Sequence, residues 1–194
     1  MRVPDVTKAA GTKVRLSDYS HIIAFHACRI EDEQVYRTRG LWPYTRETAL
    51  VEAYRKLEGS RVSKERIDKE FAPLWEEVES FGPKRVWLML ETRAFLQESC
   101  HYLLYGSEFM NALAMRLGCR ERLMSIGKPA FIQCAVPLAD IAPCWLNGLE
   151  SSIKHRGTSL SSIAVPYIAP ENILDITYPT GIVQNPYTYR SITL

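Results

Sequence analysis

The stretch SHIIAFHACRIEDEQVYRTRG, residues 20–40, decides how we interpret the rest of the chain. Its apolar run at 22–25 has the length and composition of a buried strand. His26 and Arg29 follow directly, and such side chains are costly beside a buried strand unless they have partners. The next residues change from acidic to basic, which suits a short helix, and Gly40 can end it. We therefore predict a strand, a polar corner and a short helix that ends at Gly40.

Polar side chains at such a corner are candidates for binding, because a rigid strand can direct them into a cleft. We predict that the His26 imidazole bonds a hydroxyl and that the Arg29 guanidinium holds a phosphate through two hydrogen bonds. The alternative is a core histidine and an arginine bonded to nearby carbonyls. Cys28 could act as a nucleophile, but a buried thiol is the better interpretation. Arginines flanking Gly40 could bind phosphate or RNA, although a solvated helix end explains them as well.

The composition is that of an ordinary globular protein, with 194 residues of which 46% are hydrophobic and 24% are charged. A net charge of +2 gives no global attraction to nucleic acid, although it is compatible with a local basic surface. Five cysteines without a C-x-x-C pair favour a reducing compartment, and their spacing predicts no metal site. No leader or membrane-spanning run is visible, so we expect a cytoplasmic protein without membrane association.

Further strands are predicted where apolar runs recur, at 85–90, 128–137, 159–167 and after a turn at 170–176. Because helices lie between them and most connections are short, we predict an α+β fold with a mixed or antiparallel central sheet flanked by helices. The chain contains no G-x-G-x-x-G and no P-loop motif, which disfavours a dinucleotide-binding fold and a P-loop nucleotidase.

A charged helical pair interrupts this strand pattern. Thr45 can cap a helix that ends near residue 57, and Ser63 can cap a second one. Pro73 lies inside the second helix and predicts a kink or a split there. We expect a single domain over 1–194, with a helical insertion or lid at about 44–82.

A second candidate site is the segment Tyr105-Gly106-Ser107-Glu108, which follows His101-Tyr102. Ser107 is a good helix cap, and the glycine lets backbone N–H groups approach a ligand. The carboxylate of Glu108 in the first turn could hold a ribose hydroxyl or stabilise a developing cation. A capped helix with a glutamate that suits its dipole is an equally good interpretation. Glu171 is another candidate acid, better explained as a turn residue.

The first unit resembles the opening of ADP-ribosyltransferase-like domains, in which a strand ends in a histidine or arginine, a short helix follows and a Gly-Leu pair closes the unit. Here these elements are His26-Ala27-Cys28-Arg29, then Tyr36, then Gly40-Leu41. The later order is also similar over residues 20–177: a second strand, an aromatic residue (Tyr102 or Tyr105) and late strands. Small toxin-like members of the family are closest in size.

The resemblance implies that NAD is a substrate that lies across the first corner. His26 would bond the nicotinamide ribose, Arg29 would meet the pyrophosphate and Tyr105 would stack on the nicotinamide. Glu108 would stabilise the transition state as nicotinamide leaves. The resemblance thus assigns catalytic roles to His26, Tyr105 and Glu108. NAD binding is assigned to the set His26, Arg29, Tyr36 and Ser107.

Two departures from the family pattern bear on the activity. The small pair after the histidine is usually Gly-Thr or Gly-Ser, and here it is Ala27-Cys28. The late strand offers no glutamate, so Glu108 or Glu171 must serve, or catalysis is altered or absent. The prediction is an NAD-dependent ADP-ribosyltransferase-like toxin or defence factor. Its acceptor would be a nucleic acid or a protein, with an inhibitor or antitoxin as a partner.

Two alternatives remain on the same fold: an RNA-directed 2′-phosphotransferase and an inactive binding module.

Overall fold

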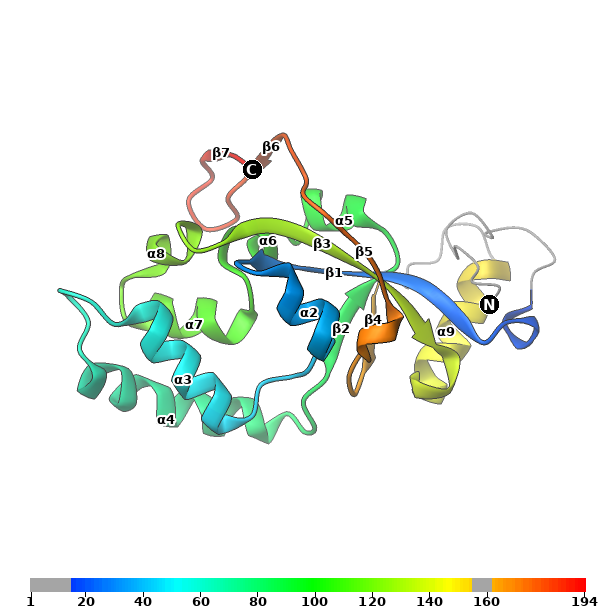
Figure 1. Cartoon of the computed structure of the whole chain (residues 1–194), viewed down its shortest axis with the longest axis horizontal. Coiled ribbons are helices and arrows are strands. Elements are labelled where there is room, and N and C mark those ends of the chain that lie inside the picture. The colour runs from blue at the N-terminus through cyan, green and yellow to red at the C-terminus, as the bar shows by residue number, and fades with distance from the viewer. Residues whose placement is uncertain (1–14, 155–161) are drawn as a thin grey trace.

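The computed structural model describes residues 15–154 and 162–194, and it contains a five-stranded sheet in the order β4-β2-β1-β3-β5 (Figure 1). Every neighbouring pair in this sheet is antiparallel, so the fold is α+β with an antiparallel sheet rather than a mixed one. A separate two-stranded hairpin is formed by β6 and β7. The strands are β1 (His21–Ile30), β2 (Val86–Met89), β3 (Lys128–Pro137), β4 (Ser162–Val165), β5 (Ile173–Thr177), β6 (Ile182–Gln184) and β7 (Ser191–Thr193).

Helices connect the strands and gather mainly at one end of the sheet (Figure 1). The three predicted caps are confirmed, because Thr45, Ser63 and Ser107 each accept a backbone N–H three residues ahead. No helix of the described residues has the length and apolar character needed to cross a membrane. The helical segments are η1 (Leu16–Asp18), α2 (Glu33–Arg39), α3 (Arg46–Leu57), α4 (Lys64–Ser80), α5 (Thr92–Gln97), α6 (His101–Tyr105), α7 (Glu108–Arg116), α8 (Arg120–Met124), η2 (Leu138–Asp140), α9 (Pro143–Lys154) and η3 (Pro170–Asn172).

Strand β1 is longer than the sequence predicts, and the predicted polar corner at residues 26–29 is wrong. The strand pairs with β3 without a break, from His21 opposite Pro137 to Ile30 opposite Lys128. The polar residues remain in the strand because both find hydrogen-bond acceptors there, as described below. The turn before α2 therefore comes only after Ile30.

The sheet is divided between β1 and β2. These strands share one paired position, Phe25 with Met89, whereas β2 pairs with β4 along its whole length. Beyond Phe25 the two strands diverge, and helix α6 lies against β1 on that side. We call this divergence the seam. The seam is relevant to function because His26 is the first residue of β1 beyond it.

Two large hydrophobic clusters hold the fold together. One lies on the sheet face that carries the even-numbered residues of β1, such as Ile22 and Cys28, and α9 packs on it through Leu149. The other is helical and joins α3 and α4 to α6, α7 and α8 through buried residues such as Leu57 and Trp75. The segment predicted as an insertion or lid thus shares a core with helices from later in the chain.

Helix α4 runs as one helix through Pro73, so the predicted segment is not split. A proline inside a helix removes one backbone hydrogen bond and crowds the carbonyl four residues earlier. Pro73 and Lys69 are both exposed, which leaves that carbonyl accessible to water. The buried residues Phe71, Leu74 and Trp75 keep the opposite face of the helix in the core.

Candidate functional site

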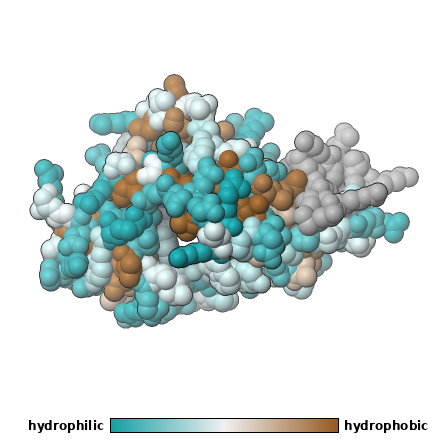
Figure 2. All heavy atoms as spheres, viewed as in Figure 1, coloured by the Kyte–Doolittle hydropathy of each residue, from teal (hydrophilic) through white to brown (hydrophobic). Residues whose placement is uncertain are grey.

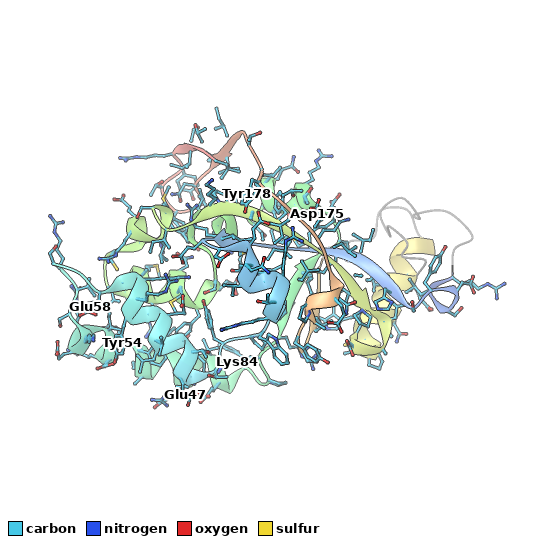
Figure 3. The ribbon with its side chains drawn as sticks, viewed as in Figure 1. Glu47, Tyr54, Glu58, Lys84, Asp175 and Tyr178 are labelled. Carbon is cyan, nitrogen blue, oxygen red and sulfur yellow. The ribbon has the colours of Figure 1, made fainter. Side chains whose placement is uncertain are left out.

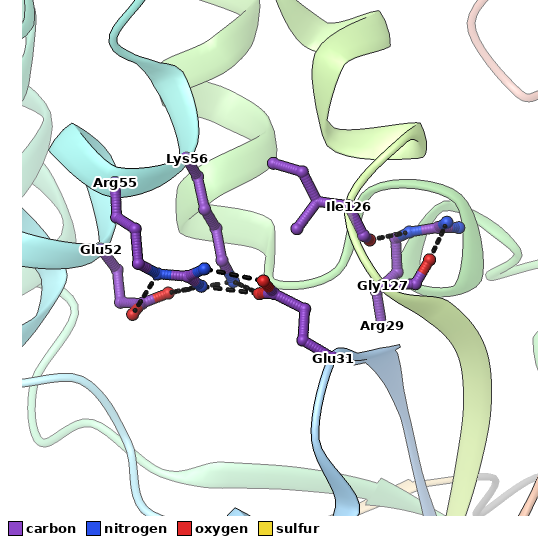
Figure 4. Close-up of polar contacts among 7 residues, drawn as sticks. All are labelled: Arg29, Glu31, Glu52, Arg55, Lys56, Ile126 and Gly127. Atoms are coloured by element: carbon purple, nitrogen blue, oxygen red, sulfur yellow. Dashed lines mark hydrogen bonds and ion pairs between the residues drawn. The ribbon is translucent and has the colours of Figure 1, made fainter.

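Arg29 is bonded to four backbone carbonyls from two segments of the chain, α6 and residues 124–127. Its Nε donates to Ile126 O at 2.8 Å, and Nη1 donates to Leu103 O at 2.8 Å. Nη2 donates to Met124 O at 2.6 Å and to Gly127 O at 2.8 Å (Figure 4). Four of the five N–H groups of the guanidinium are therefore occupied. A phosphate would have to displace these carbonyls, so the geometry favours the structural alternative for Arg29.

His26 bridges the seam with one ring nitrogen. Its Nδ1 donates to Trp87 O at 2.9 Å. Burial lowers the pKa of the imidazole below its usual 6.5, so the ring is neutral at pH 7 and Nε2 carries a lone pair. No hydrogen bond of Nε2 is found within the described residues. The predicted bond from His26 to a ligand hydroxyl stays a prediction, for which Nε2 is the remaining acceptor.

Cys28, Tyr36, Tyr44 and Ser107 form a second group on the same face of β1. Burial raises the pKa of the Cys28 thiol to about 12, which makes it a poor nucleophile. Tyr36 lies beside this thiol, and burial raises the pKa of its phenol too. Ser107 lies beside the Tyr44 hydroxyl and also accepts Met110 N–H at 3.2 Å. Tyr36 and Ser107 thus have packing and capping partners that explain them without a ligand.

An ion-pair network fixes α3 to the end of β1 (Figure 4). Arg55 donates to both carboxylate oxygens of Glu31, at 2.7 and 2.6 Å, and to both oxygens of Glu52. Lys56 lies 3.1 Å from Glu52. Hydrogen bonds from Arg55 lower the pKa of Glu31. The helical pair is thereby attached to the sheet by charge as well as by the shared core.

Glu108 lies at the start of α7 with two polar partners from α6. Its Oε1 accepts a hydrogen bond from the Tyr102 hydroxyl at 2.7 Å and lies 3.7 Å from His101 Nε2. The two rings of His101 and Tyr102 lie 4.2 Å apart. The Glu108 side chain is 68% exposed, and His101, followed by Tyr102, lowers its pKa. The result is an ionised carboxylate that is fixed in orientation and open to solvent.

Tyr105 is buried, with 3% of its surface exposed. Its hydroxyl accepts a hydrogen bond from Asn185 Nδ2 at 2.6 Å, and its ring lies 5.9 Å from that of Tyr187. The ring therefore anchors the β6–β7 hairpin and is not accessible for stacking on a nicotinamide. Tyr102 is the tyrosine that contacts Glu108.

The predicted site residues thus fall into separate groups. Glu108 joins His101 and Tyr102, and no hydrogen bond or ion pair in the described part of the chain connects it with His26. Glu171 lies in η3 and is exposed. The direct contacts of His101 and Tyr102 with Glu108 were not assigned from sequence. The signal was their position just before Gly106, whose positive φ of 79° turns α7 back toward α6.

A shallow pocket of about 470 Å³ lies between the start of α2 and strands β3 and β5. The hydroxyl of Tyr178, labelled in Figure 3, donates to Glu33 at 2.6 Å and closes one side. No group of three or more potential metal ligands occurs among residues 15–154 and 162–194. The pocket is lined by Ile30, Glu31, Asp32, Glu33, Gly127, Lys128 and Tyr178.

Comparison of the chain with models of protein families, with curated proteins and with solved structures found no match. The resemblance to ADP-ribosyltransferase-like domains therefore stays a prediction from sequence. The candidate site is defined by its geometry alone: the exposed carboxylate of Glu108 and, as a separate group, the His26 ring, whose Nε2 has no hydrogen bond within the described residues.

Proposed function

We propose that the chain is an NAD-using transferase of the ADP-ribosyltransferase type, in which Glu108 is the catalytic carboxylate. The observation that carries this proposal is the state of Glu108: ionised, solvent-facing and oriented by Tyr102 and His101. A carboxylate held in this way is suited to stabilising a positive charge that develops on a bound substrate.

The reaction would break the bond between nicotinamide and C1′ of its ribose. Nicotinamide leaves as a neutral molecule, positive charge develops on the ribose, and a nucleophile of the acceptor then attacks C1′. Because the pKa of Glu108 is lowered, its carboxylate is a weak base at pH 7. We therefore assign it to charge stabilisation, while the acceptor's proton passes to solvent.

The other residues have supporting roles in this proposal. His26 would accept a ribose hydroxyl at Nε2, and Tyr102 and His101 position the carboxylate. Arg29 and Tyr105, which the sequence assigned to NAD, hold the fold together instead. The order on which the resemblance rests, a strand, a short helix and a Gly-Leu pair, is present as β1, α2 and Gly40-Leu41. The described part of the late strand, β4, carries no acidic residue. Of the two remaining candidates we choose Glu108 over Glu171, because Glu108 is oriented by Tyr102 and His101.

The test is a nicotinamide-release assay with NAD, together with melting temperatures measured with and without NAD. Glu108→Gln should lower the rate of release by about 100-fold or more, because a neutral amide cannot stabilise the cation. Glu76→Gln, an exposed glutamate on α4, is the matched control and should release nicotinamide at the wild-type rate. Release that is unchanged in Glu108→Gln would refute the assignment.

A second candidate function is a binding module that holds a nucleotide without turning it over. It is favoured by the lack of a hydrogen bond or ion pair between His26 and Glu108 in the described residues, because a catalytic pair would be expected to meet. This candidate predicts that NAD raises the melting temperature by mass action while no nicotinamide is released.

A further inference from the structure

Two aromatic side chains, one before α3 and one after β4, stack on each other at the surface. The rings of Trp42 and Tyr167 are nearly parallel, with centroids 4.5 Å apart and an angle of 6° between their planes. Trp42 is 63% exposed and Tyr167 is 38% exposed. We call this pair the aromatic platform. Two adjacent aromatic rings that are exposed to this degree indicate a binding surface.

The backbone beneath the platform is fixed. Leu41 and Ile168, the neighbours of the two aromatic residues, exchange backbone hydrogen bonds of 2.8 and 2.9 Å and are both buried. The indole N–H of Trp42 donates to Arg39 O at 2.7 Å, which fixes the ring. At Gly40 a Cβ atom would lie 2.0 Å from Ile168 O, so only glycine fits. The platform is thus preorganised, which reduces the entropy lost on binding.

The surroundings of the platform are hydrophilic and include a cation. Arg39 ends α2 and is exposed, and its side chain has no ion pair or hydrogen bond within the described residues. Arg46 begins α3 and is followed by Glu47, which is labelled at the start of α3 in Figure 3. Hydrogen bonds from its own backbone N–H and from Thr45 are the main causes that lower the pKa of Glu47. Figure 2 shows hydrophilic residues over much of the face that carries α2 and α3. A hydrophobic protein partner is disfavoured, because the aliphatic neighbours Leu41 and Ile168 are buried.

We propose that the aromatic platform binds the bases of a single-stranded nucleic acid, with Arg39 contacting a phosphate. Exposed aromatic rings stack on any base, and a guanidinium beside them suits the backbone. Bases of a duplex are already stacked on each other and cannot reach a flat surface. The role of this nucleic acid as the acceptor of the transferase rests on the proposed function. The binding of single strands to the platform does not.

Binding is measured by fluorescence anisotropy with labelled 12-nucleotide RNA and DNA single strands and the matching duplexes. The Kd for single strands should rise about 5- to 100-fold in Trp42→Ala, because stacking of each base contributes this much. Trp42→Phe should recover most of the affinity. Arg39→Ala should reduce the salt dependence by about one phosphate contact. The control is Phe81→Ala, which removes an 82% exposed aromatic ring at the end of α4.

Three results would overturn the inference: no binding of single strands at low salt, equal loss in Phe81→Ala, or equal affinity for duplexes. Melting temperatures measured with NAD on the same variants show whether the platform binds the adenine of NAD or the bases of a single strand. If Trp42→Ala abolishes the NAD-induced rise in melting temperature but not single-strand binding, the platform serves the dinucleotide and the inference is wrong. If single strands bind through Trp42 while no nicotinamide is released, the proposed function fails and the inference stands.

Discussion

The end of β1 and the turn between α6 and α7 both carry polar residues next to a buried element, but they use them differently. At the end of β1 the donors of Arg29 are taken up by carbonyls of Leu103, Ile126 and neighbouring residues. At the turn, the carboxylate of Glu108 keeps most of its surface in water. The difference shows that the hydrogen-bond partners of a polar side chain, more than its residue type, determine whether it is available to a ligand. The carbonyls around Arg29 occupy its N–H donors, whereas the hydroxyl of Tyr102 and the imidazole of His101 orient the Glu108 carboxylate and leave it exposed to solvent.

The largest effect is expected for Arg29→Ala, which leaves four carbonyls without their donor. We expect a loss of about 3 kcal/mol or more in the free energy of unfolding, because hydrogen bonds to charged groups are among the stronger ones. Arg29→Lys should recover little, since an ammonium cannot reach all four acceptors. Urea unfolding measures both variants. A stable Arg29→Ala protein that has lost NAD binding would instead make Arg29 a ligand residue.

A pair of glycines compares the two regions directly. A Cβ at Gly127 would lie 2.7 Å from Ile30 O, whereas nothing lies within 4 Å of a Cβ at Gly106. Both have positive φ, so both alanine variants carry backbone strain of about 1–3 kcal/mol. Gly127→Ala should be the more destabilising by about 1–2 kcal/mol because of the clash as well. Equal melting temperatures for the two variants would contradict the tight packing beside Arg29.

A smaller effect is expected from Glu108 on stability. Its pKa is lowered in the folded chain relative to 4.5, so its contribution is present above pH 4.5 and disappears as the pH falls through the folded value. For this exposed group we expect at most about 1 kcal/mol between wild type and Glu108→Gln at pH 7. The gap should close in acid, as measured by urea unfolding at several pH values. A gap that widens below pH 4.5 would reverse the sign that the contacts imply.

Tyr102→Phe tests the same site through one hydrogen bond. Removing the hydroxyl should raise the pKa of Glu108, because the donor to its carboxylate is lost. The measurement is an NMR titration of the Glu108 side-chain carbonyl carbon, with Tyr54→Phe on α3 as the control. An unchanged titration would show that His101 alone sets the ionisation.

The smallest change concerns reactivity at Cys28. With a pKa of about 12 and 8% exposure, this thiol should not react with a disulfide reagent at pH 8 until the chain unfolds. Cys144 is exposed and should react in the folded protein. Counting reactive thiols before and after denaturant is added measures this. Rapid modification of Cys28 would reopen the nucleophile interpretation.

Local features of the sequence predicted the fold well where their cause lies within a few residues. The caps Thr45, Ser63 and Ser107 and the strand at 128–137 were predicted with these positions. The strand predicted at 159–167 is seen as β4 from Ser162, and residues 159–161 lie outside the described residues. The β6–β7 hairpin, which lies after the last predicted strand, was not predicted.

Contacts between distant segments could not be predicted. The carbonyls that hold Arg29 lie 74 to 98 residues away in sequence, so nothing near Arg29 shows that its donors are occupied. The same is true of Tyr105, whose partner Asn185 is 80 residues away. For Glu108 the contact with Tyr102 spans only six residues, and this shorter range explains why the sequence identified the segment although it did not assign the contact itself.

The bond between Tyr105 and Asn185 also orders events during synthesis. The helices α6 and α7 are translated long before Asn185, which follows Tyr105 by 80 residues. Until then the Tyr105 hydroxyl and the Asn111 side chain, which donates to Tyr187, lack their partners. The helices α6 and α7 therefore keep these two polar groups without their native partners until residues 185–187 have been made.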